Sequence, residues 1–194
     1  LSEADMRRSD LEKSTLVSAD LEYAILQDAD MEKAVMSGAS FRNANLRGAD
    51  FDSADVEGGK FQNADIRKAN FKRANLKNAD FSNAKVSEAN FKRAIMSGAT
   101  MTKAELGETN FTRTNLTEAH LENADLRYAN FYRAVLVNTI MTGARLSKAT
   151  FWGANLSGAN LENAKGLEQE QLDGACGNPE TVLPGNLKIK SCRK

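Results

Sequence analysis

Histidine and cysteine, two residue types often used as catalytic bases and nucleophiles, are scarce in this 194-residue chain. His120 is the single histidine, so any Ser–His or Cys–His nucleophile system would depend on this one imidazole. Cys176 and Cys192 are the only cysteines, and no histidine or carboxylate stands at a zinc-ligand spacing from them. Neither a glycine-rich phosphate loop nor an EF-hand spacing occurs. We therefore expect a protein that is not an enzyme and that has no cofactor and no metal.

Charged residues recur at a fixed interval of twenty, which is the clearest chemical pattern in the chain. Acidic residues hold one such series near the N-terminus, at Glu12, Glu32 and Asp52. That series then becomes basic, and the series one residue further on is basic over the same coils; together their basic members are Lys72, Arg73, Lys92, Arg93, Arg113 and Arg133. If residues twenty apart stack on one another, these six form a basic stripe that offers ammonium and guanidinium groups to carboxylates or phosphates. The alternative is a charged face that is only solvated.

Apolar side chains also occur near the C-terminal end, at places that elsewhere carry polar residues. They are Tyr128, Tyr132, Val135, Val137, Ile140 and Trp152. Either the chain's own tail folds over some of them, or they form an apolar patch for self-association or for a partner.

Apolar residues repeat every five positions, and this period predicts the backbone structure that positions the charged and apolar residues described above. Every fifth residue from Leu1 to Leu161 is Leu, Phe, Met, Ile or Val, and the residue two places earlier is nearly always Ala. An α-helix advances about 100° per residue, so a spacing of five never forms a stripe on it. In a single strand the same spacing alternates between the two faces. A chain that turns a corner every five residues and stacks on itself satisfies the pattern, which predicts a solenoid.

The phenylalanines indicate how many repeats make one coil. Phe51, Phe71, Phe91, Phe111, Phe131 and Phe151 form one unbroken column only if a coil contains twenty residues. Residues 1–165 then make about eight coils with four sides.

The repeats FRNANLRGAD and FWGANLSGANLENAKGL resemble the pentapeptide-repeat family, whose pattern is A(D/N)LXX. The resemblance covers residues 1–165. It implies an all-β fold, a right-handed four-sided β-helix with type II and type IV turns at its corners. It implies little about activity, because the family includes gyrase-protecting DNA mimics and many proteins with no assigned role.

Residues 166–194 depart from the period and are predicted to form a C-terminal cap, with one or two helical turns over 168–175 followed by loops. This tail resembles the C-terminal end of proteobacterial pentapeptide-repeat proteins that are often made with a secretory signal. We expect Cys176 and Cys192 to form a disulfide in it, and with it a periplasmic or otherwise extracytoplasmic location. Reduced thiols in a cytoplasmic protein are the alternative.

Composition agrees with one soluble domain, at 41% apolar and 27% charged residues, with 26 basic residues balancing 26 acidic ones. No apolar run is long enough for a membrane span. The chain starts at Leu1 in register and without Met, so we expect upstream residues, in which any signal peptide would lie.

Together these patterns predict a non-catalytic scaffold that binds a macromolecular partner, a protein, as a monomer or weak homodimer. A DNA-mimic modulator of gyrase is the alternative, although mimicry requires a strongly negative surface. Nucleic-acid or polyanion binding through the basic stripe is the third hypothesis.

Overall fold

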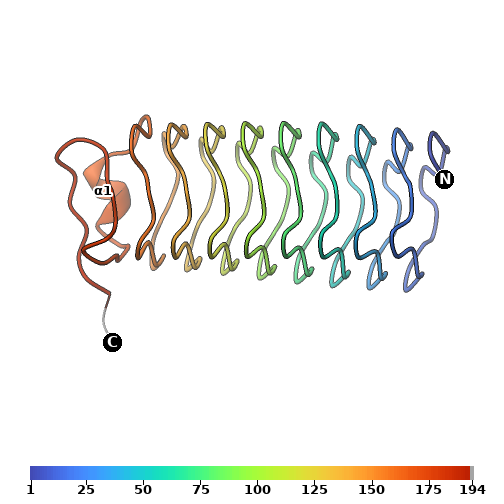
Figure 1. The fold of residues 1–194 in the computed structure, drawn as a ribbon, viewed down its shortest axis with the longest axis horizontal. Coiled ribbons are helices and arrows are strands. Elements are labelled where there is room, and N and C mark those ends of the chain that lie inside the picture. The colour runs from blue at the N-terminus through green and yellow to red at the C-terminus, as the bar shows by residue number, and fades with distance from the viewer. Residues whose placement is uncertain (193–194) are drawn as a thin grey trace.

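The computed structural model describes residues 1–192, which wind into a long row of stacked coils (Figure 1). Parallel bridges join each bridging residue to the one twenty places further on, from Asp5–Ile25 to Arg145–Lys165. Each bridge within the described residues is isolated, so the backbone pairs at one point per repeat and not along extended strands. The expected solenoid is confirmed.

A two-residue turn follows every bridge in the coils. The second turn residue has a positive φ in every repeat, from 60° at Glu3 to 58° at Asn163. The residue after it donates its N–H to the carbonyl before the turn, as from Ala94 to Phe91 at 2.9 Å. A positive φ at this place together with this bond characterises a type II turn. The expectation of mixed type II and type IV corners is therefore wrong for residues 1–165, where one turn is used throughout.

The Asp or Asn of the family pattern stabilises the turn that follows it. The side-chain oxygen of Asp80 accepts a hydrogen bond from the N–H of Ser82 at 2.8 Å, and Asn90 accepts one from Lys92 at 3.2 Å. Short side chains of this kind satisfy a backbone donor two residues later. The motif therefore encodes a corner, and the apolar residue between Asp80 and Ser82 turns inward.

Two side chains per repeat fill the interior, one large and one small. The large residues are fully buried from Leu21 to Leu161, and their phenyl rings stack between coils. Phe91 lies 5.0 Å from Phe71 and 5.4 Å from Phe111 between ring centroids, with nearly parallel planes. The neighbouring small position is Ala because close packing leaves no volume for a second large side chain.

Apart from Gly59, the exceptions at the small position are hydroxyl residues. Buried Thr109, Thr114 and Thr139 each donate to the carbonyl of the residue 23 places earlier, one coil back. Ser9 and Ser14 hold the same position in the first coil, and their hydroxyls have no hydrogen-bond partner. This end of the row also exposes core residues, with Leu1 61% exposed.

The tail closes the opposite end of the row. The last bridge in register involves Lys165, after which the chain forms helix α1 (Gln169–Leu172) and then a loop that bridges Asn155 through Cys176 and Asn160 through Val182. Leu172 is buried in the core. The disulfide between Cys176 and Cys192 is present, which confirms the predicted pair. Residues 193 and 194 of the predicted cap lie outside the described residues. Within residues 1–192, no helix has the length and apolar character needed to cross a membrane.

Candidate interaction surfaces

The structure brings the arginines of the predicted basic stripe into one column. Arg73, Arg93, Arg113 and Arg133 occupy the second turn position of successive coils, with φ between 55° and 62°. The N–H of Arg93 donates to the carbonyl of Thr112 at 3.0 Å, and the other three make equivalent bonds to the next coil. The backbone ladder therefore holds four exposed guanidinium groups one coil apart.

Intramolecular ion pairs neutralise the N-terminal part of the stripe. Arg73 Nη2 lies 2.7 Å from Asp52 Oδ1, and its Nε donates to Ser53 Oγ at 3.0 Å. Lys72 Nζ lies 3.7 Å from the same carboxylate. The acidic residues before them are also paired, since Glu12 and Glu32 contact Lys13 and Lys33.

The centre of the stripe has no such compensation. Lys92, Arg93 and Arg113 are without a carboxylate at ion-pair distance among residues 1–192. Arg133 lies with its guanidinium carbon 5.2 Å from the centroid of the Tyr132 ring, a cation–π contact. The uncompensated positive charge on the side of the row that carries the stripe therefore lies at Lys92, Arg93, Arg113 and Arg133.

The predicted apolar residues do not share one column. Tyr132 and Trp152 are one coil apart in the same column, whereas Tyr128, Val135, Val137 and Ile140 stand at other places around the coil. Trp152 is 65% exposed and rests against the tail, where a Cβ on Gly174 would lie 2.4 Å from an indole carbon. The structure thus places one large aromatic side chain at the junction of the coils and the cap.

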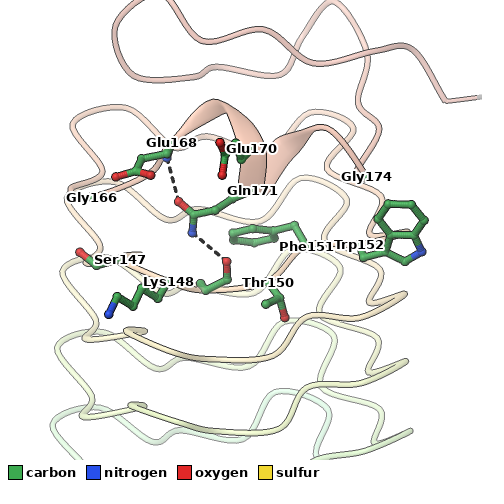
Figure 2. Close-up of a pocket in the computed structure, with 11 residues that line it drawn as sticks. Ser147, Lys148, Thr150, Phe151, Trp152, Gly166, Glu168, Glu170, Gln171 and Gly174 are labelled. Carbon is green, nitrogen blue, oxygen red and sulfur yellow. Dashed lines mark hydrogen bonds between the residues drawn. The ribbon is translucent and has the colours of Figure 1, made fainter.

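A groove of about 550 Å³ lies beside this tryptophan, between the last coil and α1 (Figure 2). Residues 147–152 form its coil wall, and Gly166, Glu168, Glu170, Gln171 and Gly174 form its tail wall. Sequence reasoning missed it. The available signal was the loss of the five-residue period after Lys165, which leaves one side of the last coil without a following coil.

The side chain of Gln171 crosses this groove (Figure 2). Its Nε2 donates to the carbonyls of Leu146 and Ala149 at 2.8 and 2.7 Å, and its Oε1 accepts from the N–H of Glu168 at 2.8 Å. In the preceding coil a backbone N–H, that of Thr150, donates to the carbonyl of Ala129. Gln171 therefore replaces one hydrogen bond of a missing coil.

His120 lies on the surface, with Nδ1 3.1 Å from Glu122 Oε1. In the described part of the chain, no three or more His, Cys, Asp and Glu residues are grouped so as to hold a metal ion.

The repeat pattern matches family models over most of the chain. The model of the pentapeptide repeat region matches residues 4–81 and 74–151, and a second model of pentapeptide repeats matches residues 144–165. This chain belongs to the pentapeptide-repeat family. No curated protein matches it.

Solved pentapeptide-repeat structures are similar to this chain over most of its length. A trypsin-treated form of QnrB1, a plasmid-mediated fluoroquinolone resistance protein, shares 16% identity over 88% of this chain and 89% of its own, with a TM-score of 0.60. HetL from Nostoc sp. strain PCC 7120, involved in heterocyst differentiation regulation, shares 25% identity over 93% and 92%, with a TM-score of 0.42. At 16% identity, the likeness to QnrB1 supports the fold alone.

Proposed function

We propose that this pentapeptide-repeat protein is a non-catalytic scaffold that binds an acidic protein through the basic stripe. The observation that carries the proposal is that Lys92, Arg93 and Arg113 have no carboxylate partner in the described residues, while Arg73 beside them is paired with Asp52. Like charges on adjacent coils about 4.8 Å apart repel one another, and a carboxylate-bearing partner would relieve this repulsion. Guanidinium groups bind carboxylates in a planar, two-bond geometry that gives specificity as well as affinity.

Binding of polyglutamate tests the stripe directly. The double variant Arg93→Ser, Arg113→Ser should weaken binding about two- to thirty-fold, because each exposed contact of this kind contributes about 0.2–1 kcal/mol and the two act on one ligand. The matched control Lys77→Ser, Lys103→Ser removes the same charge from other columns and should leave the affinity nearly unchanged. Equal losses in the two variants would show that only net charge matters and would refute the stripe.

A nucleic acid is the alternative ligand for the same stripe. Binding of a DNA oligonucleotide that is tighter than that of polyglutamate and that falls steeply with salt would favour it over a protein. Mimicry of DNA toward gyrase gains no support from this side of the molecule, because a basic stripe is opposite in charge to duplex DNA.

We also infer a right-handed four-sided β-helix of about eight coils, since four turns separate each residue from its bridge partner twenty places later. We propose a periplasmic or otherwise extracytoplasmic location, which the disulfide supports because oxidising compartments preserve such bonds. Free thiols at Cys176 and Cys192 in protein taken from its native compartment would contradict that location.

A further inference from the structure

The coil wall of the groove carries two backbone donors that lack acceptors. In the coil before it, the N–H of Tyr128 donates to the carbonyl of Ser147 at 3.1 Å and that of Phe131 to Thr150 at 2.8 Å. The equivalent donors of the last coil are the N–H groups of Lys148 and Phe151. Neither has an acceptor within residues 1–192, because the chain leaves the register after Lys165 and forms α1.

The coil wall of the groove requires hydrogen-bond acceptors, and these must stand at a defined spacing. The carbonyl of Ala149, which would receive an N–H from a following coil, already accepts from Gln171. The coil wall therefore has two N–H groups without an acceptor among the described residues, whereas its carbonyl already has a donor. In the preceding coil the acceptors belong to Ser147 and Thr150, residues three apart in one segment. Leu146–Ala149 form a turn between these two acceptors. An occupant that continues this pattern is therefore a peptide that turns once between two carbonyl groups three residues apart.

The remaining walls indicate the side chains of such a peptide. Trp152 lies at one end of the groove, and aromatic side chains exposed beside a groove commonly anchor a bound partner (Figure 2). Glu168 and Glu170 line the tail wall and make no ion pair with any described residue. Their charge favours a lysine or arginine in the peptide, and a volume of about 550 Å³ lies in the usual range for ligand sites.

We propose that a basic, turn-forming segment of a partner polypeptide binds in this groove and continues the backbone ladder of the coils. Two of its carbonyls accept hydrogen bonds from the N–H groups of Lys148 and Phe151, one of its side chains packs on Trp152, and a basic side chain pairs with Glu168 or Glu170. Main-chain hydrogen bonds of this kind supply affinity, and the flanking side chains supply specificity.

The first experiment measures amide hydrogen exchange in the free protein. The amides of Lys148 and Phe151 should exchange at least about tenfold faster than those of Tyr128 and Phe131, which hold the same places one coil earlier and are hydrogen-bonded. Equal protection of the four amides would overturn the proposal, since the two donors would then already be satisfied.

The second experiment uses a positional-scanning library of acetylated, amidated hexapeptides and the protein's NMR spectrum. Basic peptides should shift the Lys148 and Phe151 amides and the Trp152 indole saturably. Trp152→Ala should weaken binding about tenfold or more, and Glu168→Gln with Glu170→Gln should abolish the preference for Lys or Arg. Tyr132→Ala, one coil earlier in the tryptophan's column, is the control and should bind normally. The absence of shifts across the library, or the same shifts with sodium acetate alone, would overturn the proposal.

Discussion

At the scale of single residues, the small inward position shows how one hydroxyl stabilises or destabilises according to its surroundings. Thr114 Oγ1 donates to the carbonyl of Phe91 at 2.7 Å, whereas Ser14 Oγ has no partner. A buried polar group without a hydrogen bond costs about 1–3 kcal/mol, and a satisfied one contributes about 1 kcal/mol.

Ser14→Ala should therefore raise the melting temperature, because it places at this position the alanine that most other repeats carry. Thr114→Ala should lower the melting temperature, because a hydrogen bond and a methyl group are lost. We expect the free energy of unfolding to fall by about 1–2 kcal/mol. Thermal unfolding of both variants measures the contrast. Changes of the same sign would show that the hydroxyl groups are not what distinguishes the two sites.

The ion pair of Asp125 gives the stability of the fold a pH dependence. Hydrogen bonds from Arg127, at 2.7 and 2.6 Å, hold the pKa of the Asp125 carboxyl below its usual value of 3.8. A lowered pKa in the folded state adds stability above the unfolded pKa, and this stability is lost as the pH falls through the folded value.

Asp125→Asn should therefore lower the melting temperature at pH 7 by about 2 °C, a modest effect because the pair is partly exposed to solvent. The difference from the parent should shrink below about pH 4, where this carboxyl is protonated first in the unfolded chain and, at still lower pH, in the folded protein. Arg127→Gln should reproduce the same loss. A difference that stays constant between pH 7 and pH 3 would contradict the assignment of this effect to the pair.

At the scale of the repeat, the stacked phenylalanines form a column in which each ring is fixed by the coils on either side. Phe91 is fully buried between Phe71 and Phe111, and Phe81 contacts it edge-on with ring centroids 5.8 Å apart. Because the backbone ladder fixes the coil spacing, neighbouring coils cannot collapse into a cavity at this site.

Phe91→Ala should lower the free energy of unfolding by about 3–5 kcal/mol, through lost burial and an unfilled cavity. Ala89→Leu should also destabilise, by about 1–3 kcal/mol, because the adjacent volume is already occupied. Chemical denaturation with urea measures both. Parent-like stability in both variants would mean that the inward assignment of these positions is wrong.

The features of the structure that the sequence predicted best are those that recur in every repeat. Each corner uses the same turn, so one five-residue pattern, read many times, predicts the solenoid, and the phenylalanine column predicts the coil length. The groove depends instead on a single event, the departure of the chain from its register after Lys165, which no repeated pattern records. Likewise the arginine column follows from the spacing of twenty, but the pairing of Arg73 with Asp52 depends on side-chain conformations that the spacing does not determine.

At the scale of the whole molecule, the two ends of the row differ. The tail covers one end through Leu172 and is fastened by the disulfide, while Leu1 is exposed at the other end of the described row. In a solenoid each coil is stabilised mainly by its neighbours, so local opening is expected to begin at the ends.

Reduction of the Cys176–Cys192 disulfide should lower the melting temperature. For a loop of this length, the free energy of unfolding should fall by up to about 3 kcal/mol. Reduction should speed amide exchange in residues 166–192 and leave the amides of the central coils protected, because their ladder does not involve the tail. The Cys176→Ser, Cys192→Ser variant should behave like the reduced protein. Loss of protection along the whole row would instead show that the cap is required for every coil to fold.

The pairing of residues twenty apart also governs how such a gene can change in length. A duplication or deletion of twenty codons within the coils adds or removes one rung and leaves each remaining column intact, with Arg93 still followed by an arginine. A change of five codons preserves the inward pattern but moves all later residues by one side, so the arginine column is split between two faces. Selection on core packing alone accepts both events, whereas selection on a surface column retains only the first. Family members that vary in length by whole coils are thus expected to keep their surface columns in line.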